Sequence, residues 1–177
     1  MLILLAVHLV VAVSLPLLAR WLGRLVWPLG AAVPAATVVW AAVHTPHVLA
    51  GGTLRERLGW ASPLGLEFVH RLDGLSLLMV YVVSGVGVAV LAYSAHYFPR
   101  GTGREAGLLL AFAGAMLGLV TADHLLALYV FWELTTVVSF LLISGRGRGP
   151  AHRRAAEQAL LTTAAGGLAM FLGFLLL

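Results

Sequence analysis

The segment from residue 106 to residue 144 constrains the fold more than any other part of the chain. It reads AGLLLAFAGAMLGLVTADHLLALYVFWELTTVVSFLLIS and is interrupted by the polar TADH at 121–124. A helix of about 20 apolar residues crosses the roughly 30 Å hydrocarbon core of a bilayer, so this segment is too long for one crossing. It predicts two membrane helices, the fourth and fifth of the chain, that meet in a tight turn at TADH.

Apolar segments of membrane length also occur before and after this pair. The chain is 61% hydrophobic and 10% charged, with a mean hydropathy of +1.00, which is far from the composition of a soluble domain. Together the segments predict an all-α, polytopic membrane protein with six transmembrane helices. The other four helices are expected at about residues 2–19, 25–50, 74–98 and 155–177.

The basic residues predict how the chain crosses the membrane. All eleven are arginine, and they fall in the connections between apolar segments. Eight lie in the connections after the first, third and fifth predicted helices and three in the connection after the second, which places the amino terminus outside. This pattern favours anionic lipid headgroups over nucleic acid as the partner, even for GRGRGPAHRR at 145–154. Since the chain has no cysteine, disulfides and cysteine-based metal sites are excluded.

Glu133 stands in FWELTTVVSF, among neighbours that are compatible with lipid. If the fifth helix enters the membrane near Asp123, ten residues at 1.5 Å each place Glu133 about 15 Å deep, at the midplane. An ionised group there costs about 3 kcal/mol or more, so Glu133 must face protein or water and either find a partner or stay protonated. Tyr129, Thr136 and Ser139 share its side of the helix, as in an intramembrane proton path. The alternative is a structural glutamate that is hydrogen-bonded to a neighbouring helix.

Three histidines have simpler interpretations than a functional site. His8 falls in the middle of the first helix, and a hydrogen bond to an adjacent helix is favoured over a role in proton relay. His44 and His47 have a spacing that suits a metal ligand pair, but we expect Pro46 to break the helix that would align them. No metal site and no cofactor site is predicted.

Polar residues at the helix ends are interpreted mainly as caps. Asp73 precedes GLS and is expected to cap the third helix, with a contact to Arg71 as a further possibility. Asp123 and His124 lie in the predicted outer turn, where a cap is favoured over an outer funnel for cations. GAMLG at 114–118 is a GxxxG pattern, which predicts a surface for close helix packing.

Two stretches of the sequence carry a resemblance to a known family. HRLDGLSLLMVYVVSGVGVAVLAYSAHYF and GAMLGLVTADHLLALYVFWELTTVVSFLLIS resemble the opening segment of the antiporter-like subunits shared by Mrp-type multisubunit cation/proton antiporters and complex I. The resemblance covers about residues 64–177, and the sixth helix, EQALLTTAAGGLAMFLGFLLL, looks like that of the A subunit of Mrp antiporters. It implies that Glu133 is the essential proton-translocating glutamate of the WEL motif. Relatives often carry a lysine where this chain has Gln158, so a role for that cation is not expected here.

The resemblance also implies a function and partners. It implies a secondary transporter subunit, not an enzyme, that exchanges Na⁺, K⁺ or Li⁺ for H⁺ within a hetero-oligomer in a bacterial plasma membrane. The alternative is a proton-pumping membrane subunit of a complex I type NADH-quinone oxidoreductase. The expected domains are an amino-terminal three-helix segment, 1–105, and the truncated start of the antiporter-like repeat, 106–177. A lysine partner for Glu133 and the helices that cover its face are expected beyond Leu177.

Overall fold

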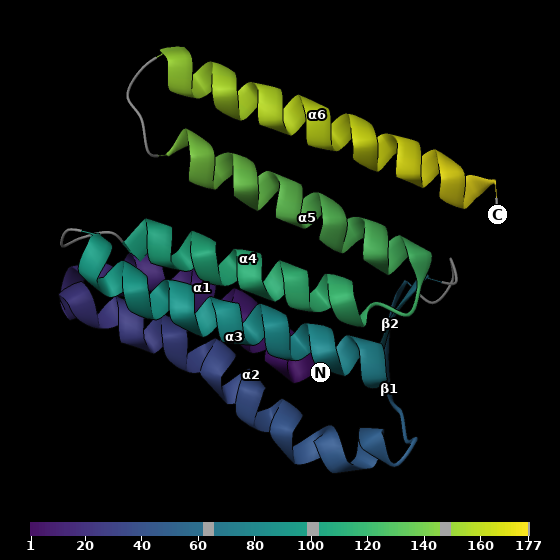
Figure 1. The fold of residues 1–177 in the computed structure, drawn as a ribbon. Coiled ribbons are helices and arrows are strands. Elements are labelled where there is room, and N and C mark those ends of the chain that lie inside the picture. The colour runs from purple at the N-terminus through teal and green to yellow at the C-terminus, as the bar shows by residue number, and fades with distance from the viewer. Residues whose placement is uncertain (62–65, 99–102, 146–149, 177) are drawn as a thin grey trace.

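The computed structural model describes residues 1–61, 66–98, 103–145 and 150–176, which form six long helices and one β-hairpin (Figure 1). The helices pack side by side, and the hairpin lies at one end of the bundle. The elements in chain order are α1 (Leu2–Leu22), the short 3₁₀ turn η1 (Gly23–Leu25), α2 (Val26–Leu49), β1 (Leu54–Ala61), β2 (Leu66–Leu72), α3 (Gly74–Tyr97), α4 (Gly103–Thr121), α5 (Leu125–Ser144) and α6 (Pro150–Leu175).

The predicted helical membrane fold is confirmed, and six long helices lie at the predicted places with boundaries shifted by a few residues. Five helical stretches of the described residues are long and apolar enough to cross a membrane, and the first of them, Leu2–Leu49, contains α1, η1 and α2. The chain reverses direction at η1, because Gly30 of α2 lies against Leu15 of α1, 3.3 Å from the position of an added Cβ. The first stretch therefore consists of two helices that pack against each other.

The prediction that Pro46 breaks the second helix is wrong. Helix α2 continues through both Pro34 and Pro46 to Leu49. The two histidines nevertheless have separate contacts. The His44 ring packs at a tilt against the Trp40 ring, with the centroids 4.3 Å apart, and the His47 ring lies against Gly52. No group of three or more potential metal-ligating side chains occurs in the described ranges.

A two-stranded antiparallel hairpin, absent from the all-α prediction, connects α2 to α3. Strands β1 and β2 pair with Glu56 opposite His70, and the register shifts between Gly59 and Ala61. Phe68, His70 and Leu72 alternate along β2 and enter the protein interior, and Arg71 is exposed, although Val69 is also buried. This alternation with a period of two is the sequence signal of a half-buried strand.

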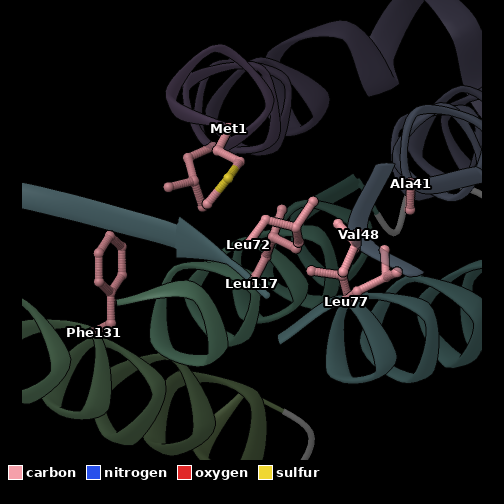
Figure 2. Packing of buried hydrophobic residues seen from close by; sticks show 9 residues of the cluster. Met1, Ala41, Val48, Leu72, Leu77, Leu117 and Phe131 are labelled. Atoms are coloured by element: carbon pink, nitrogen blue, oxygen red, sulfur yellow. The ribbon is translucent and has the colours of Figure 1, made fainter. Parts of the chain in front are cut away.

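The hydrophobic core has one cluster at each end of the bundle. The cluster next to the hairpin joins Met1, just before α1, with Leu72 of β2 and with Leu77, Leu117 and Phe131 of three different helices (Figure 2). The other cluster joins Leu15, Trp27, Leu91 and Leu110, among other residues, at the η1 end. Since both clusters draw on α1, α2, α3 and α4, these four helices form the compact part of the chain.

The GxxxG pattern on α4 is confirmed as a packing surface. A Cβ added to Gly114 would lie 2.8 Å from Cβ of His8 on α1, and one added to Gly118 would lie 2.3 Å from the Phe131 ring on α5. His8 is fully buried there, but its Nδ1 bonds to the Leu4 carbonyl oxygen of its own helix at 2.8 Å. The expected hydrogen bond to an adjacent helix is therefore wrong.

The hairpin is attached to the turn between α4 and α5. The Asp123 amide donates to the Val69 carbonyl oxygen of β2 at 2.8 Å, and the Asp123 carboxylate pairs with Arg55 of β1. His124 is the N-cap of α5, and its Nδ1 accepts from the Leu126 amide at 3.2 Å. The cap interpretation of this turn is confirmed through His124, whereas Asp123 serves mainly as an anchor for the hairpin.

Two arginines fasten the opposite end of the bundle. Arg24 donates to the Ala95 carbonyl oxygen near the end of α3 at 2.5 Å, and Arg104 donates to the Leu141 carbonyl oxygen near the end of α5 at 3.2 Å. Cations in these places satisfy terminal carbonyls and oppose the negative end of the helix dipole. Within the predicted basic connection, residues 146–149 lie outside the described residues.

Candidate functional site

Helix α5 lies between α4 and α6, and each neighbour contacts a different side of it (Figure 1). Toward α4, the Phe131 ring lies over Gly118 and its centroid is 5.6 Å from that of His70. Figure 2 shows Phe131 pointing from α5 toward β2. Toward α6, the Tyr129 and Phe171 rings pack with centroids 4.7 Å apart. Both sides of α5 are thus fixed by aromatic contacts.

Glu133 lies near the middle of α5, on the side that faces α6. It is eight residues beyond Leu125, which corresponds to about 12 Å along the helix axis. Its Oε1 atom is buried, and no hydrogen-bond partner for it is found among the described residues. Such an atom is rare in a folded protein, because an unsatisfied buried polar group costs about 1–3 kcal/mol.

The carboxyl of Glu133 lies directly on the backbone of α6 at Gly167. A Cβ added to Gly167 would be 2.1 Å from Oε1 and 3.3 Å from the carboxyl carbon. The pairs 129 with 171 and 133 with 167 advance by one helical turn in opposite directions, as expected for antiparallel helices. Glu133 thus occupies a space that exists because residue 167 has no side chain.

The threonine hydroxyl groups near Glu133 in the sequence donate hydrogen bonds to the backbone of α5. Thr136 is buried and donates to the Trp132 carbonyl oxygen at 3.3 Å, and Thr135 donates to the same oxygen at 2.7 Å. A hydroxyl that donates to its own helix can still accept a hydrogen bond through its oxygen. Ser139 is half-buried further along the helix. The polar stripe of Tyr129, Thr136 and Ser139 along this side of α5 stays a prediction from the sequence.

No positive charge balances Glu133 within the part of the chain that the structure describes. The ion pairs found there join hairpin residues to Met1, Asp73 and Asp123, at the end of the bundle. Arg104 bonds at Leu141, which is eight residues or about 12 Å along α5 from Glu133. The described residues therefore offer the Glu133 carboxyl no cationic partner.

The end of the bundle that carries the hairpin holds its charges outside the membrane-spanning helices. Asp73 accepts from the Ser76 amide at 2.9 Å in a complete capping box and pairs with Arg71 at 2.6 Å, so both interpretations of Asp73 are confirmed. The Ser76 amide and Arg71 lower the pKa of Asp73 to about 2. His70 is fully buried and bonds to the Thr121 hydroxyl at 3.0 Å, and burial lowers its pKa.

Helix α6 covers part of the Glu133 side of α5, which the family resemblance implied would be covered by helices beyond Leu177. Tyr129 and Glu133 contact Phe171 and Gly167 of α6, and cover of the rest of this face by helices beyond Leu177 stays a prediction. Gly167 itself was not among the candidate residues from the sequence. The GG pair at 166–167 was the available signal, because two adjacent glycines are unfavourable within a helix.

Two known families match separate parts of the chain. Residues 60–105 match the family described as NADH-Ubiquinone oxidoreductase (complex I), chain 5 N-terminus. Residues 122–177 match the family described as NADH:quinone oxidoreductase/Mrp antiporter, TM, and include the α4–α5 turn, Glu133 and Gly167. Both matched parts of the chain are thus similar to antiporter-like membrane subunits.

Curated proteins similar to this antiporter-like chain are named as antiporter subunits. It is 41% identical over 158 residues to the A/B subunit of the probable K(+)/H(+) antiporter of Rhizobium meliloti (strain 1021), a match that covers 88% of this chain and 16% of that protein. It is 36% identical over 176 residues to the A1 subunit of the Na(+)/H(+) antiporter of Staphylococcus aureus (strain JH9), covering 96% and 22% respectively. The chain thus spans between 16% and 22% of the length of these relatives.

Solved structures agree with the antiporter-like fold. A chain of the Mrp complex from Dietzia sp. DQ12-45-1b superposes with a TM-score of 0.79 at 37% identity, covering 96% of this chain and 18% of that chain. A chain of the membrane-bound sulfane sulfur reductase, an archaeal respiratory membrane complex, superposes with a TM-score of 0.77 at 18% identity, covering 93% and 34%. The second likeness is one of fold alone.

Proposed function

We propose that this chain is part of a subunit of a monovalent cation/proton antiporter, in which Glu133 carries the proton through the membrane. The names of its relatives support exchange of Na⁺ or K⁺ for H⁺. The likeness to the Dietzia Mrp complex supports a hetero-oligomer of several membrane subunits. We place this complex in the plasma membrane of a bacterium, with the arginine-rich connections in contact with anionic lipids on the cytoplasmic side.

The buried, unpartnered Oε1 of Glu133 is the observation that carries this proposal. A carboxyl that is needed only for packing gains its stability from hydrogen bonds, and this atom makes none to the described residues. A carboxyl that takes up and releases protons instead needs a neutral resting state and a later partner for its ionised state. Tyr129, Thr136 and Ser139 are the proposed path residues, through which protons pass along hydroxyl groups and water to and from Glu133.

The proposed function divides the chain at the start of α4. Residues 1–105 form an amino-terminal three-helix segment, which includes the hairpin. Residues 106–177 contain most of α4 together with α5 and α6, and form the first part of the proton-translocating repeat. In this division the segment 1–105 holds the repeat in place through the packing of α1 on α4 and of the hairpin on the α4–α5 turn.

The experiment is a comparison of glutamate variants in the complete antiporter complex. Everted vesicles are energised to a fixed pH gradient, and a pH-sensitive dye reports proton movement when Na⁺ or K⁺ is added. Glu133→Gln keeps the size of the side chain but cannot ionise, so we expect cation-dependent proton movement to be abolished. Glu133→Asp keeps a carboxyl and should retain part of the exchange.

Glu105→Gln is the matched control, because it makes the same chemical change in the first turn of α4, away from the centre of α5. It should leave exchange close to the rate of the unmodified complex. Western blotting of each complex must show equal assembly. Exchange at the unmodified rate in the Glu133→Gln complex would overturn the proposed role of Glu133.

A second candidate function is that of a proton-pumping membrane subunit of complex I type. It is favoured by the description of both matching families, which names NADH oxidoreductases. The two candidates differ in what drives proton movement: a cation gradient for an antiporter and NADH oxidation by quinone for complex I. Purified complex that catalyses quinone reduction by NADH would favour the second candidate, and cation-driven proton exchange without NADH favours the first.

A further inference from the structure

Two adjacent glycines near the middle of α6 have very different surroundings. A Cβ added to Gly167 would lie 2.1 Å from Oε1 of Glu133, whereas a Cβ added to Gly166 would have nothing within 4 Å among the described residues. Each glycine destabilises a helix interior by about 1 kcal/mol relative to alanine. Both glycines therefore lower the stability of α6. Only at Gly167 does the missing side chain make room for a neighbouring group, the Glu133 carboxyl.

We propose that Gly167 is the positioning residue for the Glu133 carboxyl: its missing side chain leaves the space in which Oε1 lies against the α6 backbone. This inference rests on the proposed function, because it assigns Gly167 a role in the same proton-carrying site. It concerns where the carboxyl is held, and it does not require Gly167 to touch a transported ion.

The contacts around the pair explain why the carboxyl has this single place. One turn away, the packed rings of Tyr129 and Phe171 set the separation of α5 and α6. At the level of Gly167, Cδ1 of Trp132 lies 3.5 Å from the position of the added Cβ, so the space is bounded by this ring as well as by the carboxyl. A methyl group at residue 167 must therefore displace one of these neighbours.

The carboxyl is the neighbour that yields. Oε1 is the end of a flexible side chain, whereas the helices are held together by the aromatic pair. Gly167→Ala should consequently leave α5 and α6 packed and shift the carboxyl by about 1 Å or more. Transfer reactions are sensitive to such shifts, and a misplacement of about 1 Å can cost about 100-fold in rate.

The test compares Gly167→Ala with Gly166→Ala in the complete antiporter complex. Both variants make the same substitution in the same helix and gain the same intrinsic helix propensity. We expect cation-dependent exchange to fall by about 100-fold in Gly167→Ala, with an altered pH profile, and to stay near the unmodified rate in Gly166→Ala. If Glu133→Gln abolishes exchange, equal exchange and equal pH profiles in the two glycine variants would overturn the proposal.

A shorter acid provides the rescue. Aspartate lacks one methylene group, so the double variant Glu133→Asp/Gly167→Ala should exchange faster than Gly167→Ala alone. Should the Gly167→Ala complex fail to assemble, Glu133→Ala/Gly167→Ala removes the carboxyl that meets the new methyl group, and assembly should then return. The proposal is contradicted if Glu133→Asp/Gly167→Ala does not recover exchange, or if Glu133→Ala/Gly167→Ala does not recover assembly where Gly167→Ala has lost it.

Chemical labelling separates this inference from the proposed function. Dicyclohexylcarbodiimide modifies protonated carboxyls in apolar surroundings, and mass spectrometry of the α5 peptide measures modification of Glu133 without any transport. Displacement of the carboxyl from the α6 interface should accelerate labelling in Gly167→Ala and leave it unchanged in Gly166→Ala. If Glu133→Gln does not reduce exchange but this difference in labelling is observed, the proposed function fails and the positioning role stands. Equal labelling of the two glycine variants contradicts the positioning role.

Discussion

Replacement of Asp73 by alanine should loosen the first turn of α3. The substitution removes the bonds from the Ser76 amide and hydroxyl, both 2.9 Å long, and the ion pair with Arg71. Loss of an N-cap costs about 1 kcal/mol. The decrease of the Asp73 pKa from 3.8 to about 2 corresponds to about 2 kcal/mol at neutral pH as an upper bound. Since the Arg71 side chain is 44% exposed, solvent screens part of this, and we expect a loss of about 1–2 kcal/mol.

Hydrogen exchange measured by mass spectrometry on the peptide that begins α3 is the assay, because it reports local opening. A loss of about 1.4 kcal/mol speeds the exchange of amides in the first turn about tenfold. Asp73→Asn is the control, since asparagine caps helices about as well as aspartate but carries no charge. It should exchange more slowly than Asp73→Ala, and equal exchange in the two variants would refute the assignment of the effect to the cap.

The pH dependence of this effect has a definite sign. The folded state lowers the pKa of Asp73, so the charge-dependent stabilisation is complete above about pH 3.8 and is lost as the pH falls toward about 2. The difference in exchange between the unmodified protein and Asp73→Ala should therefore narrow over this range. A difference that stays constant from pH 7 to pH 3 would show that the carboxylate charge contributes nothing.

Three further predictions concern other parts of the chain. Burial lowers the pKa of His70, so the docked hairpin should lose stability as the pH falls below about 6.5, seen as faster hydrogen exchange in β2; His70→Phe should abolish this dependence. Gly118→Ala places a methyl group against an aromatic ring of α5 and should destabilise the protein by about 1–3 kcal/mol, whereas Gly85→Ala, which meets nothing within 4 Å, should not lower the melting temperature. A cysteine at Leu58 of the hairpin should react with an impermeant thiol reagent from outside intact cells, and one at Ala151 should react after permeabilisation; the reverse pattern contradicts the predicted topology.

The sequence predicted the helices well because their signal is strong and local. Long apolar segments, the TADH interruption and the Asp73 cap each act within a few residues, so the six helices and the turn before α5 could be placed without knowledge of the tertiary structure. The hairpin was missed because its alternation covers only a few residues between much longer apolar segments. Its stability comes from contacts with α4 and the α4–α5 turn, which are distant in sequence.

The candidate site was predicted only in part, for a related reason. Periodicity placed Tyr129 and Thr136 on the side of α5 that carries Glu133, because all three lie on one helix. It could not identify Gly167, because the partner of a carboxyl on a second helix depends on the register between the helices. The partner of His8 was assigned incorrectly for the opposite reason: a carbonyl one turn away in its own helix was available at 2.8 Å.

Phe131 and Glu133 limit how α5 can rotate about its own axis. They are two residues apart, so their side chains are separated by about 200° around the helix axis. Phe131 lies against α4 and Glu133 lies against α6. A rotation of α5 that withdraws the carboxyl from α6 must turn the Phe131 ring away from Gly118 and from its edge contact with His70. If protonation or deprotonation of Glu133 turned α5, the rotation would therefore also move the contact between Phe131 and His70. The exposed surface of the hairpin would then change with the protonation state of Glu133.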